Sequence, residues 1–145
     1  MKQSCENIYK NARRAAGLTQ EQAAEQLFIS VRSLVDYESG KTLPPDDVVC
    51  RMVEVYGSKP LAYLHLKNST EVGRRFLPEL NILDLPRSVL KLQKEVKDIT
   101  DIQHQMVDVA CDGVVDSHEK ETWSNIEKEL MEMVGAGLSV VFAWR

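Results

Sequence analysis

The chain has 145 residues, of which 43% are hydrophobic, so it can bury one ordinary core or two small ones. No apolar run approaches the roughly 20 residues of a membrane span, and the first residues lack the apolar stretch of a signal peptide, so we expect a cytoplasmic protein. The net charge is −4, with eight Lys and Arg against eight Asp and Glu in residues 1–66 and an acidic excess only beyond them. Three widely spaced cysteines favour reduced, partly buried thiols over a disulfide or a zinc site.

The first two predicted helices cover roughly residues 6–16 and 20–27. Gly17 is expected to end the first of them in a left-handed conformation. Thr19 can cap the second through its hydroxyl while Gln22 reaches back to the Thr19 N–H, which makes a capping box. The inward positions of the second helix are Ala23, Ala24 and Leu27, small enough near the middle for another helix to cross closely.

A third helix is expected to begin after Ser30, whose side chain is a preferred N-cap. Leu34 and Tyr37 fall three residues apart on one face of this helix. The other side carries Val31, Arg32, Ser33, Val35 and Asp36. One face therefore packs against the domain, and the other is free to contact a partner.

In this region the chain resembles the lambda-repressor-like, XRE-type family of bacterial and phage regulators, over about residues 8–66. The matching residues are Gly17, Leu18, Thr19, Gln20, Glu21, Ala24, Leu27, Ile29, Ser30, Tyr37, Glu38 and Gly40. The resemblance implies a five-helix DNA-binding domain that places its third helix in the major groove. It also implies a partly buried ion pair between Arg13 and Glu38, which we interpret as structural.

By this resemblance, Gln20 and Lys41 would lie near phosphates, and the third helix would face base edges. The predicted DNA-contacting set is Gln20, Ser30, Val31, Arg32, Ser33, Asp36 and Lys41. Two residues depart from the common pattern: Phe28 stands where glycine is frequent, and Val31 stands where several members carry glutamine. Valine can contact only a thymine methyl, which leaves Arg32 as the best candidate for a guanine.

The rest of the N-terminal part supplies two more predicted helices. Pro45 suits a first helical position, and Asp46 and Asp47 favour the N-terminal dipole of a fourth helix that ends at Gly57. Its inward positions are Val48 or Val49, Met52, Val53 and Tyr56. A short fifth helix is expected from Ser58 through Leu64. Residues 67–85 break the pattern and are interpreted as a linker with apolar side chains that pack on a neighbouring domain.

From residue 86 to 145 the periodicity predicts an antiparallel helical hairpin. The apolar seam of its first helix is predicted at Leu85, Val89, Leu92, Val96, Ile99, Gln103, Met106 and Ala110. The seam of its second helix is predicted at Trp123, Ile126, Leu130, Met133, Gly137, Val140 and Trp144. Further apolar positions widen both stripes, which favours a dimer interface or packing on the N-terminal domain over a purely intramolecular core. The last eight residues have the β-branched content of a short strand as an alternative.

The connection between these helices has a partial likeness to a calcium-binding EF-hand loop. Asp108, Asp112, Asp116 and Glu119 occupy its first, fifth, ninth and twelfth places. Ala110 stands at the third place, where a side-chain oxygen is normally supplied. We therefore interpret the segment as a turn and a helix cap, with calcium kept as an alternative. The three histidines have no ligand spacing and are expected on the surface or on helix faces, and we expect no cofactor.

No catalytic motif is found, so the sequence predicts a non-enzymatic protein. The fold expected is all-α, with a DNA-binding domain at 1–66, a linker at 67–85 and a hairpin at 86–145 that dimerises or receives an effector. Its predicted function is a transcriptional repressor that binds a palindromic site on double-stranded DNA as a homodimer, because a neutral domain binds DNA weakly alone. Two alternatives remain: an antirepressor-like or antitoxin-like adaptor that uses the hairpin, and a regulator that senses a small molecule or ion.

Overall fold

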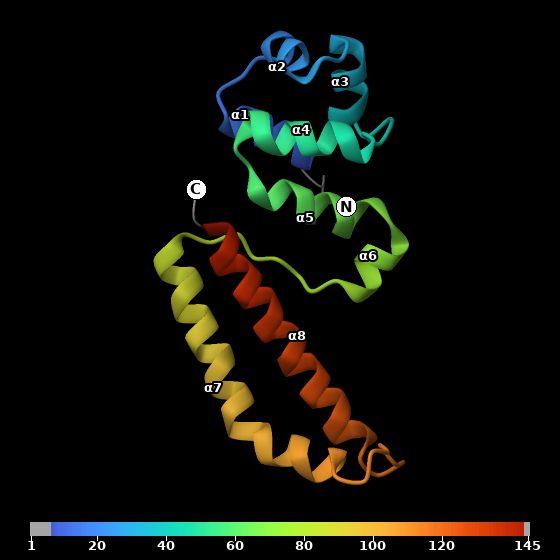
Figure 1. Cartoon of the computed structure of the whole chain (residues 1–145), viewed down its shortest axis with the longest axis vertical. Helices are drawn as coiled ribbons and strands as arrows, with labels where there is room; N and C mark the ends of the chain where they lie inside the picture. The colour runs from blue at the N-terminus through green and yellow to red at the C-terminus, as the bar shows by residue number, and fades with distance from the viewer. Residues whose placement is uncertain (1–6, 144–145) are drawn as a thin grey trace, which may run out of the picture. The chain divides into compact units, whose positions relative to one another are not determined.

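The computed structural model describes residues 7–143, and within that range the chain forms eight helices and no strand (Figure 1). The helices are α1 (Ile8–Ala15), α2 (Gln20–Leu27), α3 (Val31–Glu38), α4 (Asp46–Tyr56), α5 (Lys59–Ser69), α6 (Glu71–Phe76), α7 (Leu85–Ala110) and α8 (Lys120–Ala143). The all-α prediction is confirmed. None of these helices is long and apolar enough to cross a membrane.

The chain divides into two compact units, one ending at Leu77 and the other beginning at Pro78. In the first unit, α1 to α5 surround one apolar core. Its fully buried side chains include Leu27, Leu34, Met52 and Leu61. Ala23 and Ala24 are also buried, so the inward face of α2 carries small side chains beside Leu27.

The helix ends of the first unit lie close to the predicted positions, with small differences. Gly17 has a φ angle of 73°, as its predicted left-handed conformation requires, and Gly57, where the fourth helix was expected to end, has a φ angle of 61°. Pro45 is the N-cap of α4 and not its first residue. The fifth helix is longer than expected and continues to Ser69.

The segment 67–85, where the sequence shows no sustained helical pattern, is largely helical in its first half. The end of α5 and all of α6 lie there, and only Thr70 and residues 77–84 are without helix. Gly73 does not mark a turn: it is buried on α6, and a Cβ there would collide with the backbone oxygen of Leu66. Lys67 is also buried, and its ammonium donates to the carbonyl oxygens of Arg74 and Leu77 at 3.3 and 2.9 Å. This cation neutralises the C-terminal end of α6. The composition of the segment does not predict such a contact.

The second unit is an antiparallel hairpin of α7 and α8 (Figure 1). Its seam on α7 differs from the predicted one. The buried residues are Ser88, Glu95 and Val109, whereas the predicted seam residues Val89 and Val96 are 37% and 47% exposed. The two stripes share Leu92, Ile99 and Met106, which are half-buried. The predicted stripe, with Val89 and Val96, and the observed stripe, with Ser88 and Glu95, have the same heptad spacing and alternate with the same shared residues. Heptad spacing alone therefore does not distinguish them, and the structure places the more polar stripe against α8.

The C-terminal segment is helical through Ala143, so the alternative of a short strand is wrong for the described residues. Residues 144 and 145, including the predicted seam residue Trp144, lie outside the described range. Near this end Gly135 is buried, and a Cβ there would lie 2.5 Å from the backbone oxygen of Glu79. The segment that enters the hairpin therefore packs closely along α8.

Candidate nucleic-acid interface

The helix-turn-helix segment is built as its sequence signals require. The Thr19 hydroxyl accepts from the Gln22 N–H at 3.2 Å, and the Gln22 side-chain oxygen accepts from the Thr19 N–H at 3.0 Å. The predicted capping box is thus confirmed. It fixes where α2 begins relative to the end of α1.

The turn between α2 and α3 contains an unusual backbone conformation. Phe28 ends α2 with φ 56° and ψ 42°, in the left-handed region, and among the described residues no other non-glycine residue has a positive φ. Its side chain is 86% exposed. A glycine, which is frequent at this position in the family that the sequence resembles, would adopt the same conformation without strain. The chain therefore differs from the common pattern in residue type but keeps a left-handed turn.

The third helix presents a solvent-exposed face. The Ser30 hydroxyl accepts from the Ser33 N–H at 3.0 Å, which confirms Ser30 as the N-cap of α3. Leu34 and Glu38 anchor the helix from its buried side. Of the predicted base-facing residues, Val31 and Arg32 are exposed, and Ser33 and Asp36 are half-buried. The structure therefore places these four side chains along α3 away from the core.

An ion pair fixes α3 to α1. Arg13 donates through Nε to Oε1 of Glu38 at 2.6 Å and through Nη2 to Oε2 at 2.9 Å, and both side chains are buried. A third Arg13 donor binds the Leu18 carbonyl at 2.7 Å. Burial opposes ionisation of Glu38, but hydrogen bonds from Arg13 and Gln20 and the Arg13 charge outweigh it, so the pKa of Glu38 is lowered. The predicted structural ion pair is confirmed.

Gln20 has a role that the sequence did not indicate. Its side-chain nitrogen donates to Oε2 of Glu38 at 2.9 Å, so the amide belongs to the buried ion pair of α1 and α3. A phosphate contact at Gln20 stays a prediction, and it would use the remaining N–H of the amide. Lys41, the other predicted phosphate neighbour, is exposed with its ammonium 3.4 Å from a carboxylate oxygen of Asp36.

His65, expected on the surface or on a helix face, lies on the buried face of α5. This histidine is buried and joins three helices: its Nδ1 lies 2.8 Å from the Tyr9 hydroxyl and its Nε2 lies 3.2 Å from an Asp46 oxygen. A neutral ring can accept from the tyrosine and donate to the aspartate, so both contacts are satisfied together. Single-sequence reasoning missed this contact because its three members lie far apart along the chain.

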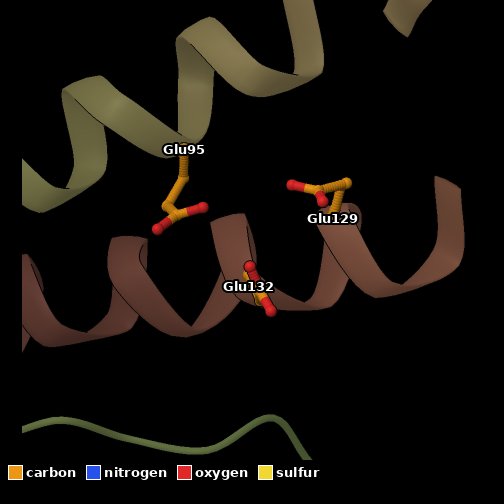
Figure 2. Close-up of side chains that lie close together, drawn as sticks. All are labelled: Glu95, Glu129 and Glu132. Atoms are coloured by element: carbon orange, nitrogen blue, oxygen red, sulfur yellow. The ribbon is translucent and has the colours of Figure 1, made fainter. Parts of the chain in front are cut away.

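The acidic residues of the alternative calcium loop accept hydrogen bonds from nearby backbone N–H groups. Asp112 accepts from the Val114 N–H, Asp116 from the His118 N–H, and Glu119 from the Asp116 N–H. Asp108 lies on the last turns of α7. In the described part of the chain, only one set of acidic side chains lies close enough together to hold a metal ion. It consists of Glu95, Glu129 and Glu132, in the hairpin (Figure 2). The structure does not bring the loop carboxylates together.

The cysteines differ from expectation in their exposure. Cys50 and Cys111 are free thiols, as expected, but they are exposed and not partly buried. Cys5 lies outside the described residues. Cys50 follows Val48 and Val49, which take the inward face of α4 and leave the cysteine toward solvent.

Comparison with known proteins agrees with this geometry. Residues 10–62 match the family model of a helix-turn-helix domain, which spans α2 and α3 and most of the helices packed around them. No curated protein and no solved structure matches the chain. The match covers the unit that carries the exposed face of α3, and it supports a DNA-binding regulator.

Proposed function

From a helix-turn-helix domain at residues 10–62, we propose that this protein is an XRE-type transcriptional repressor that reads double-stranded DNA through α3. The observation that carries the proposal is the division of α3 into two faces. Leu34 and Glu38 fix the helix to the core, while Val31, Arg32, Ser33 and Asp36 remain accessible. A short helix held rigidly with one polar, accessible face is the geometry that major-groove readers use.

We propose specific roles for the accessible residues. Arg32 is exposed, and its guanidinium can donate two hydrogen bonds to a guanine. Val31 offers only an apolar contact to a thymine methyl, and Asp36 can accept from a cytosine amino group. Lys41 and the free N–H of Gln20 would lie near phosphates and set the register of the protein on the duplex.

We further propose that two copies act together on a palindromic site. Residues 1–66 carry no net charge, so one copy gains little from counterion release and needs a second to bind tightly. Support comes from α7, where a row of apolar side chains lies outside the seam with α8 and stays exposed: Leu85, Val89, Val96 and Val107. A symmetric pair would set two recognition helices about 34 Å apart, one turn of DNA.

The test is binding-site selection from random duplex DNA, followed by titration of the selected duplex with variants. Arg32→Ala should lose about 1–3 kcal/mol of specific binding free energy and relax the preference at one base position. Arg14→Ala is the matched control, because it removes a positive charge from α1 that is also exposed. Equal losses of binding free energy in both variants would mean that the duplex responds only to the positive charge of the protein and that Arg32 contacts no base. An adaptor without DNA-binding activity would select no sequence at all.

A further inference from the structure

The hairpin holds three carboxylates where its two helices meet. Glu95 comes from α7, and Glu129 and Glu132 come from one turn of α8. Each residue offers an oxygen within 4.8 Å of the oxygens of the other two. Figure 2 shows Glu95 reaching from α7 toward α8, where the two other carboxylates lie. Three negative charges this close repel one another unless something positive lies between them.

Glu95 is the informative member of this cluster because it is 4% exposed and lies in the helix–helix seam. Its Oε2 is buried and has no hydrogen-bond partner. The nearest positive group, the Lys94 ammonium, lies 3.6 Å from Oε1 and hydrogen-bonds Asp98 at 2.6 Å. That lysine therefore leaves Oε2 unsatisfied. A buried carboxylate oxygen without a donor indicates a missing ligand, since native interiors pair such groups.

The surroundings of the cluster limit what that ligand can be. Glu129 is half-buried and Glu132 is exposed, so the cluster opens to water on the α8 side. The Lys128 ammonium lies 3.8 Å from Glu132 and is itself exposed, so it can move away. An all-carboxylate donor set selects hard divalent cations, and a site with only three protein ligands suits an ion that keeps several waters, such as Mg²⁺ or Mn²⁺.

We propose that Glu95, Glu129 and Glu132 bind one divalent cation of the Mg²⁺ or Mn²⁺ class. The ion accepts electron pairs from one oxygen of each carboxylate, and water completes its coordination. It links α7 to α8 across the seam and satisfies the buried Oε2 of Glu95. This site is independent of the proposed DNA-binding activity and of the predicted calcium loop, with which it shares no residue.

The direct test is titration of the full-length protein with MnCl₂, followed by the electron paramagnetic resonance signal of free Mn²⁺. Wild type should remove one Mn²⁺ per chain from the free pool. Glu95→Gln and Glu129→Gln should each weaken this binding by about tenfold or more, since each removes a charged ligand. Glu121→Gln is the control: it removes an exposed charge from α8 outside the cluster and should bind as wild type does. Undiminished binding in Glu95→Gln, or none in wild type, overturns the proposal.

A second readout follows the stability of the hairpin itself. Both tryptophans, at positions 123 and 144, belong to this part of the sequence, so the tryptophan emission maximum reports its thermal unfolding. Saturating Mn²⁺ should raise the Tm of wild type and Glu121→Gln by roughly 5 °C over an EDTA sample. Glu95→Gln should fold without metal and show no such shift. Equal Tm values of the wild type with Mn²⁺ and with EDTA would overturn the proposal.

Discussion

At the scale of single residues, one buried side-chain polar atom among the described residues of the first unit has no hydrogen-bond partner. The hydroxyl of Tyr56 is buried without a hydrogen-bond partner. Burial and the Glu38 charge raise the pKa of Tyr56 to about 12, although the Arg13 charge opposes them. Tyr56→Phe should therefore increase the free energy of unfolding by about 1 kcal/mol at pH 7, as measured by urea unfolding with circular dichroism.

The same residue predicts a pH dependence. Tyrosine in the unfolded chain ionises near 10, whereas Tyr56 in the folded chain ionises only near 12. Between these values the unfolded state binds fewer protons, so the stability of the wild type should fall as pH rises through that window. Tyr56→Phe should lose less stability over the same window. A variant that is less stable at pH 7 would mean that the hydroxyl has a favourable partner. A variant whose stability falls as steeply with pH would mean that the pKa of Tyr56 is not raised in the folded chain.

At the scale of elements, the turn between α2 and α3 stores strain that can be removed. Phe28 holds a left-handed conformation with its side chain in solvent, so replacing it sacrifices little packing. Phe28→Gly should relieve about 1–2 kcal/mol of strain and lose about 0.5–1 kcal/mol to the greater freedom of the unfolded glycine. We expect a net gain of up to about 1.5 kcal/mol in urea unfolding. Phe28→Ala is the control: it keeps the strain, so a gain equal to that of glycine would contradict this account.

Local signals in the sequence predicted these elements well where a single residue determines the beginning or end of a helix. Thr19, Ser30 and Gly57 cap or end helices through contacts within a few residues, and the structure confirms each of them. The Arg13 and Glu38 pair was accessible only through the family resemblance, because its members lie on different helices. The sequence did not predict the burial of Glu95, because the stripe of α7 that carries it shares members with a more apolar stripe of the same spacing.

At the scale of the whole molecule, the exposed row on α7 should mediate self-association. Val96 lies near the middle of that row and is 47% exposed. Val96→Lys should convert a dimer into a monomer in sedimentation velocity and weaken binding to a palindromic duplex, while the monomer stays folded. Leu90→Lys is the matched control, because Leu90 is also exposed but lies about 120° around the helix from Val96. A monomeric wild type, or equal effects of both variants, would contradict the proposed dimer.

The two solvent-facing thiols have a practical consequence. Cys50 belongs to α4 in the first compact unit, and Cys111 follows α7 in the second. With Cys5 replaced by serine, a donor and an acceptor dye can be attached through maleimide chemistry, one to each unit. Energy transfer between the dyes then reports, in a single cuvette, how operator duplex or manganese changes the separation of the two units.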